Sequence, residues 1–339
     1  MKKAILLLII CLSNLIFAQN FDKNWYKVID LENEGKIATV YKEVKNIHQK
    51  ADNKHNEAQI IKCFFYESKY LMTLKEDAQK EIIDNLQLEM STASEPTKAL
   101  LNLIYAQCLE SYYNKNQYHL SKRTTIETAN QGSFLTWNRE EFVKQIELAY
   151  EASLHSEEVL KNTPIERYDA VFDYINKDEF QKTSLYNYIL SESIAYYKTK
   201  CDLNEYYPKL STPYLSKLIG SHNEFKSISL DSIKNQAIKK TLSLYQKGDY
   251  TEKASKLELN RMLFCNEYIS HQDESLLLQL NQFEKRNNDT ILKLFIQFEK
   301  AKLYEQLASK NKFPDYNTKA VTVLDSILKT SKYTSIYKL

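Results

Sequence analysis

The sequence has little glycine or proline. Its 339 residues include only four glycines and five prolines. Sheets joined by tight turns normally need more of both residues, because such turns require a positive or a fixed φ. Helices joined by short polar loops do not have this requirement. The scarcity argues against a sheet-rich fold and predicts an all-α protein.

Motifs that carry chemistry are missing as well. No two cysteines form a CxxC pair, which excludes a zinc ribbon and a thioredoxin-type site. A GxSxG motif does not occur, and the scattered glycines form no phosphate-binding loop. The SxxK matches at Ser309 and Ser326 lack the SDN and KTG elements that would accompany a serine nucleophile. We therefore predict no catalytic residue, no cofactor-binding residue and no metal ligand, and a protein that is not an enzyme.

The histidines do not suggest a metal site. None belongs to an HExxH motif, and no two are four residues apart, the spacing that would turn both toward one zinc ion. Carboxylates are numerous, but no pair stands out as an acid and a base. We expect solvated side chains for the six histidines: His48, His55, His119, His155, His222 and His271.

The first 18 residues have the order of a secretory signal peptide. Two lysines precede an apolar run over 4–12, and Ala18 offers a small residue for cleavage. The run is too short to cross a bilayer, which takes about 20 residues. Cys11 is the one candidate for lipid attachment, but Ile10 precedes it where a lipoprotein signal has a small residue. We predict export to the periplasm or cell envelope, without a lipid anchor.

Charge is balanced in the rest of the chain. Removal of Lys2 and Lys3 from the 46 basic residues leaves 44, which equals the 44 acidic residues. Nucleic-acid binding usually needs a basic excess on one face. We therefore expect no nucleic-acid partner.

Four cysteines follow the leader: Cys63, Cys108, Cys201 and Cys265. In an oxidising compartment they could form two disulfides, although spacings this wide do not dictate the pairing. Cys63 and Cys108 lie within apolar helical patterns, which favours buried free thiols at these two positions.

Helical periodicity runs from end to end. Val40, Val44 and Ile47 follow the spacing that lines one face of a helix. At 163–166, a threonine, a proline and a glutamate have the order of a helix start, and Asn138 has the surroundings of a cap. The predicted helices span 22–34, 36–51, 55–75, 77–90, 96–115, 138–155, 164–175, 183–200, 206–219, 229–246, 250–271, 273–287, 289–309 and 316–330.

The short connections predict antiparallel helix pairs. We expect an N-terminal helical subdomain over 19–115, a long connecting loop over 116–137 and a C-terminal helical-repeat subdomain over 138–339. The glycines at Gly35 and Gly248 mark hairpins typical of tetratricopeptide (TPR) repeats. No 34-residue period extends through the chain, so we interpret it as an irregular TPR-like array. Such arrays usually leave a concave face for a partner.

Aromatic residues are the one excess, with 25 tyrosines, 14 phenylalanines and two tryptophans. Tyrosine pairs at 112–113, 196–197 and 206–207 could form a carbohydrate or peptide platform. Tyrosines at helical spacing more often bury their rings between helices and let the hydroxyl reach water. We favour core packing over a ligand platform.

Three stretches share order and spacing with a known family. They cover 24–51, 133–154 and 160–168. They resemble the helical N-terminal region of large bacterial α2-macroglobulin-like proteins, and the likeness extends over essentially the whole chain after the leader. We expect a structural rather than a chemical role for the prominent residues of these stretches: Trp25, Gly35, Trp137 and Pro164. We expect the same of Gly248.

The resemblance implies the scaffold or docking region of a secreted protease inhibitor. In that family, β-sandwich domains, a bait segment and often a thioester between a cysteine and a glutamine trap the protease. The nearest match here, Cys265 to Tyr268, has no glutamine and cannot form the ring. We expect a fragment, a split gene or a stand-alone copy, with proteases or the rest of a macroglobulin assembly as partners. The alternative is a stand-alone TPR-like adaptor that binds proteins in the periplasm.

Overall fold

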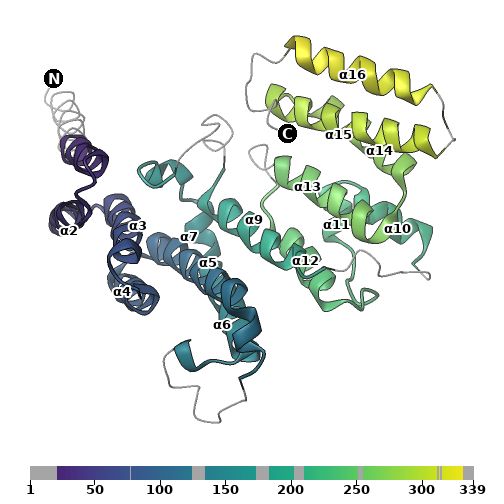
Figure 1. Ribbon diagram of the computed structural model, residues 1–339. Helices are drawn as coiled ribbons and strands as arrows, with labels where there is room; N and C mark the ends of the chain where they lie inside the picture. Colours follow the sequence, from purple (N-terminus) through teal and green to yellow (C-terminus); the bar gives the residue numbers. More distant parts are fainter. Residues whose placement is uncertain are drawn as a thin grey trace, which may run out of the picture. The chain divides into compact units, whose positions relative to one another are not determined.

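The protein is helical throughout the part of the chain that the structure describes. The computed structural model describes residues 21–76, 78–123, 134–172, 183–201, 210–250, 255–310, 313 and 315–330 (Figure 1). Within these ranges the only β-type pairing is an isolated bridge between Pro164 and Ser184. The predicted all-α class is confirmed. The predicted signal peptide lies outside the described residues.

The chain forms two compact units. Unit 1 consists of the described residues among 1–156 and 167–173, and unit 2 of those among 157–166 and 174–339. The described ends of the predicted loop over 116–137 belong to unit 1. Its first residues continue a helix to Leu120, and residues 134–136 form a short 3₁₀ helix.

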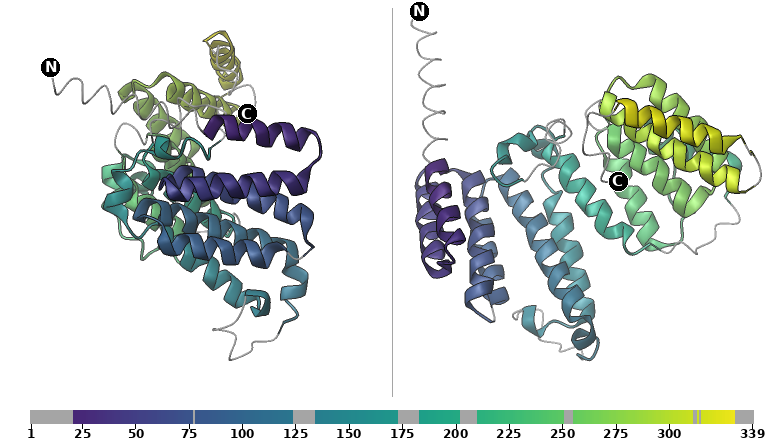
Figure 2. Two further views of the ribbon diagram at one scale, coloured as in Figure 1. Left: turned by 90° about the vertical axis from the view of Figure 1, so that its left-hand side faces the viewer. Right: turned by 45° about the horizontal axis from the view of Figure 1, so that its top comes forward.

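Unit 1 is a series of neighbouring helices. A helix over 21–33 comes first. Successive helices then pack as antiparallel pairs, α2 on α3, α3 on α4, α4 on α5 and α5 on α6, which confirms the expected pairing (Figure 2). The elements are α2 (Ile37–Asn53), α3 (Glu57–Leu74), α4 (Ala78–Thr92), α5 (Glu95–Leu120), η2 (Phe134–Thr136) and α6 (Arg139–Ser153).

The core of the first three helices follows from the predicted stripe. Val40 and Val44 of α2 are fully buried and pack with Trp25 of the preceding helix. The indole N–H of Trp25 donates a hydrogen bond of 2.7 Å to Gln59 Oε1 of α3. Gly35 makes the intervening turn with a φ of 70°, a conformation that favours glycine.

Aromatic packing joins α5 to α6. The ring of Tyr112 stacks on Phe142 with centroids 5.5 Å apart, and Trp137 meets the same Phe142 ring edge-on at 5.3 Å. Asn138 starts α6 as predicted, because its side chain accepts a 2.9 Å hydrogen bond from the N–H of Glu141. Such a cap contributes about 1 kcal/mol.

Unit 2 carries its own core. Leu280 and Ile296, both fully buried, belong to a cluster of side chains from α13, α14 and α15. The helix α15 also packs along α16, the last described helix (Figure 1). The remaining elements in chain order are α7 (Glu157–Lys161), η3 (Ile165–Tyr168), α9 (Leu185–Lys198), α10 (Thr212–Ile219), α11 (His222–Lys226), α12 (Gln236–Lys247), α13 (Ser255–Cys265), the π-helical turn η5 (Asn266–Ser270), α14 (Asp273–Arg286), α15 (Thr290–Ser309) and α16 (Tyr316–Thr330).

The predicted helix over 164–175 is wrong in its described part. Only the four residues of η3 are helical there, followed by a turn. The hydroxyl of Thr163 donates to the carbonyl of Val159 instead of capping a new helix, and the Thr163 carbonyl accepts from the N–H of Leu185. Pro164 forms the bridge to Ser184. Backbone pairing with residues 184–185 has therefore prevailed over the local signal for a helix start at 163–166.

Two further details differ from the sequence patterns. The helix predicted over 229–246 begins only at Gln236, because the side chain of Asn235 caps it through the N–H of Ile238. Gly248 ends this helix with an ordinary negative φ. A Cβ at this glycine would lie 2.6 Å from Leu257 Cδ2, so close packing rather than a left-handed turn favours glycine.

Candidate functional site

The structure gives no sign of a nucleophile at the described cysteines or at Ser309. All four described cysteines are free thiols. Burial raises the pKa of the Cys265 thiol to about 12 and that of Cys108 to about 11, which keeps both thiols protonated and unreactive. The hydroxyl of Ser309 donates to the carbonyl of Gln306 within its own helix.

Three of the four tyrosines in the described pairs are buried in the core. Tyr113, Tyr196 and Tyr197 are each at most 6% exposed. The rings of Tyr196 and Tyr197 meet edge-on with centroids 5.0 Å apart. The preference for core packing is confirmed for these residues, while the pair at 206–207 lies outside the described residues.

Four histidines are exposed as expected: His55, His119, His155 and His271. The expectation is wrong for the other two. The ring of His222 stacks on Tyr250, with centroids 5.1 Å apart and planes within 8°. His48 is held between carboxylates of three helices. Sequence spacing could not reveal either environment, because Tyr250, Glu67 and Glu89 come from segments distant from the histidines that they contact.

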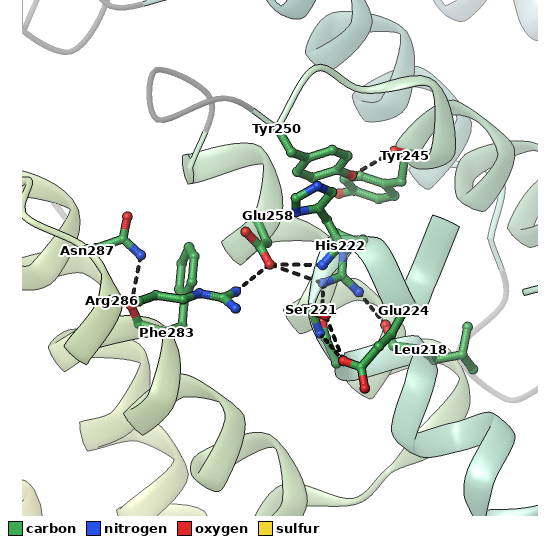
Figure 3. A network of polar contacts seen from close by, with 12 residues as sticks. Leu218, Ser221, His222, Glu224, Tyr245, Tyr250, Glu258, Phe283, Arg286 and Asn287 are labelled. Carbon is green, nitrogen blue, oxygen red and sulfur yellow. Dashed lines mark hydrogen bonds and ion pairs between the residues drawn. The ribbon is translucent and has the colours of Figure 1, made fainter. Parts of the chain in front are cut away.

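A buried arginine, Arg261, centres a polar network in unit 2, and Figure 3 shows several of the residues around it, among them Leu218 and Glu258. Arg261 of α13 has no exposed surface. Its guanidinium donates to the backbone carbonyls of Leu218 and Gly220 at the end of α10, and it lies over the ring of Phe225 at 4.7 Å. The last carbonyls of a helix lack partners within that helix, so this contact completes the C-terminus of α10.

Glu258 balances the charge of this arginine. Its Oε1 atom lies 3.8 Å from the Arg261 guanidinium. The same atom accepts the N–H of His222 at 3.2 Å and pairs with Arg286 at 2.5 Å (Figure 3). The polar groups of this network come from α11, α13 and α14, and their partners are one another and the backbone carbonyls at the end of α10. We interpret the network as a structural tie among these helices and α10.

A second polar cluster lies in unit 1, where α2, α3 and α4 meet. His48 Nδ1 is 2.7 Å from Glu67 Oε1 of α3. On the other side of the ring, His48 Nε2 is 3.2 Å from Glu89 Oε1 of α4 and 3.8 Å from Asp52 Oδ1 of α2. We call these four residues the His48 cluster.

The carboxylates control the charge of this cluster. Burial opposes protonation of His48, but the hydrogen-bonded carboxylate of Glu67 and the nearby carboxylate of Glu89 outweigh it and raise the pKa of His48 to about 10. Burial raises the pKa of Asp52 above its ordinary value, with help from Glu89 and Glu67 and against the effect of His48. The cluster therefore favours the binding of positive charge.

An apolar groove lies across the next three helices. We call it the α3–α5 groove; it has a volume of about 280 Å³. Phe64, Ile82 and Ile83 form its buried floor, each at most 7% exposed. Phe65 and Met72 also line the groove and are more exposed, with 43% and 58% of their surface accessible. Apolar side chains this exposed, arranged around one hollow, are typical of binding surfaces.

Side chains of α5 line the remaining side of the groove. Cys108, Ser111, Tyr112 and Lys115 line it from α5, and residues three or four apart share one face of a helix. Lys115 is exposed and has no ion-pair partner among the described residues. The α3–α5 groove thus combines an apolar floor with basic charge at its edge.

The sequence contained a signal for this groove. The helix α3 carries more apolar residues than one face can bury, since Phe64 and Phe65 are adjacent and Met72 follows Leu71. Leu71 and Phe64 are buried, which leaves Phe65 and Met72 on the exposed side. A single apolar stripe at helical spacing does not reveal this excess.

A second hollow is less suited to binding. Its seven lining residues, from Arg139 to Glu151, all belong to α6. A single helix surface offers no opposing wall, and most of the lining side chains are charged. We therefore do not regard it as a binding site.

Comparisons with protein-family models, curated proteins and solved structures find no match to this chain. In the described residues, no helix combines the length and the apolar character needed to cross a membrane.

Proposed function

We propose that this chain is a non-catalytic helical scaffold that binds an amphipathic helix of a protein partner in the α3–α5 groove. The observation that carries the proposal is the exposure of Phe65 and Met72 beside a buried apolar floor. A partner helix would place bulky apolar residues in the groove at helical spacing. Its acidic residues would face Lys115 at the edge.

Peptide selection tests this proposal. We expect helical peptides selected on the purified chain to combine an apolar stripe with acidic flanks. Met72→Glu should weaken the affinity of these peptides at least tenfold, because it places a charge against the apolar contact. Leu88→Glu is the matched control: Leu88 is 67% exposed on α4 and does not line the groove. Isothermal titration calorimetry measures both. Failure to enrich any peptide, or equal binding to Met72→Glu, would contradict the proposal.

The scaffold is further proposed to be an irregular TPR-like array. Antiparallel neighbours and the left-handed turn at Gly35 support this assignment. The leader pattern of residues 1–18 supports export to the periplasm or cell envelope.

Two kinds of partner are compatible with the scaffold. The three stretches that resemble the macroglobulin helical region support a docking role beside a macroglobulin-like protease inhibitor. In the described structure, Trp25 and Trp137 from these stretches pack into the core of unit 1. The second candidate is a stand-alone adaptor, supported by the α3–α5 groove itself. The macroglobulin partner is the first choice, because the resemblance covers most of the chain.

A further inference from the structure

The His48 cluster brings three potential metal ligands together from two helices. His48 and Asp52 lie four residues apart on α2, so they share one face of that helix. Glu89 reaches them from α4. One ligand atom from each residue, the His48 Nε2 and two carboxylate oxygens, lies within 4.8 Å of the other two.

The spacing of these atoms suits a tetrahedral ion. Nitrogen and oxygen ligands about 2.1 Å from a tetrahedral zinc ion are about 3.4 Å from one another. The Nε2 atom of His48 is 3.2 Å from Glu89 Oε1 and 3.8 Å from Asp52 Oδ1. These two distances bracket the required value, and Asp52, whose side chain is 54% exposed, can adjust toward the ion.

The Nε2 atom also lacks a hydrogen bond. It is buried, and no acceptor among the described residues is aligned with it; Glu89 is close but off the N–H direction. On the opposite side of the ring, Nδ1 lies 2.7 Å from Glu67 Oε1, which can accept a hydrogen bond from the Nδ1–H. A carboxylate that holds one ring nitrogen and orients the other is the usual second partner of a metal-binding histidine.

The charges in the cluster are not balanced by basic side chains. Three carboxylates surround one imidazole, and no lysine or arginine among the described residues forms an ion pair with any of them. Even with a proton on the imidazole, the three carboxylates leave an excess of negative charge, and a divalent cation that takes the place of the Nε2 proton would reduce this excess. One imidazole with two carboxylates is a donor set for zinc or a similar transition metal rather than for calcium or magnesium, which prefer oxygen ligands alone.

We propose that His48, Asp52 and Glu89 bind a divalent transition metal ion such as Zn²⁺, with Glu67 orienting the imidazole. The ion would tie α2 to α4. Three protein ligands leave a fourth position for water or for a group of a partner protein. This inference is independent of the proposed peptide binding, because the ligands do not line the α3–α5 groove.

Zinc titration of the purified chain tests the site. The chain should carry no histidine tag and be freed of metal with EDTA. We expect calorimetry to show one Zn²⁺ per chain and the melting temperature to rise. Glu89→Gln and His48→Gln should each lower the affinity at least tenfold, and Glu67→Gln about 10- to 100-fold. Mg²⁺ should bind much more weakly.

The control is His155→Gln, since His155 is an exposed histidine outside the cluster. This variant should bind Zn²⁺ like the unmodified chain. Far-UV circular dichroism shows whether each variant is folded, and Glu89→Gln keeps the test valid if His48→Gln unfolds. Absence of stoichiometric binding, or equal affinity in the folded Glu89→Gln variant, would overturn the proposal.

Discussion

Glu57 of unit 1 has a carboxylate with several partners. It lies at the start of α3, and its two oxygens accept hydrogen bonds from the N–H and hydroxyl of Ser94, at 2.8 and 2.7 Å, and from the hydroxyl of Thr97 at 2.8 Å. The Arg167 guanidinium lies 2.7 Å away. Burial alone would raise the pKa of Glu57, but these donors and the arginine outweigh it and hold the pKa below the ordinary value.

A lowered pKa makes this contribution depend on pH. The stabilisation is present above the ordinary glutamate pKa of about 4.3 and is lost as the pH falls through the lower pKa of the folded state. We expect Glu57→Gln to lower the free energy of unfolding by about 1–3 kcal/mol at pH 7. The difference should shrink as the pH falls through the lowered pKa of Glu57, where the unmodified glutamate also becomes neutral. Urea unfolding at several pH values measures it.

Glu81→Gln provides the comparison at this scale. Among the described residues, Glu81 forms an ion pair only with Lys75, and the side chains of Glu81 and Lys75 are 39% and 55% exposed. A solvent-exposed pair of this kind contributes about 0–1 kcal/mol. A loss in Glu57→Gln that matches this control, or that stays constant with pH, would contradict the role assigned to Glu57.

At the scale of elements, Arg261 shows how one side chain completes another helix. Its guanidinium takes up the carbonyls of Leu218 and Gly220, and it also faces Glu258. Methionine at this position would fill similar volume but leave these carbonyls without donors. We expect Arg261→Met to lower the free energy of unfolding of unit 2 by about 3–5 kcal/mol. Urea denaturation followed by circular dichroism measures the loss.

The neighbouring arginine gives a matched control. Arg286 contacts the same Glu258, but its side chain is 43% exposed, so water can replace the contact. Arg286→Met should lower the free energy of unfolding by about 1 kcal/mol or less. Equal losses in the two variants would show that the carbonyl contacts of Arg261 contribute little.

At the scale of the whole molecule, each unit has a separate hydrophobic core. The core around Val40 and Trp25 belongs to unit 1, and the core around Leu280 and Ile296 to unit 2. The α3–α5 groove and the His48 cluster both lie in unit 1. The proposed binding functions therefore concentrate in the first half of the chain.

The identity of the partner is also a question at this scale. If the macroglobulin proposal is correct, the DNA beside the gene should encode macroglobulin domains. Their purified product should bind this chain, and Met72→Glu should weaken that binding. Sequencing of the adjacent DNA and a pull-down with the two purified proteins are the measurements. Absence of such a reading frame, with capture of one defined non-protease partner through the groove, would favour the adaptor.

The sequence by itself determined the helical class and most helix positions. The scarcity of glycine and proline favours helices throughout the chain. Apolar stripes such as Val40, Val44 and Ile47 favour a helix locally, whichever helices lie beside it. Caps such as Asn138 act within a few residues and were equally predictable. The predicted helix after Pro164 failed because a distant partner, Ser184, took over that segment.

Only the tertiary structure decided where the candidate sites lie. Glu67 and Glu89 lie 19 and 41 residues after His48, on two other helices. Their contact with His48 therefore could not be predicted from sequence spacing. The exposed positions of Phe65 and Met72 depend on how α3, α4 and α5 pack. Periodicity indicates which side chains share a helix face, but the neighbours of that face are set by packing between helices.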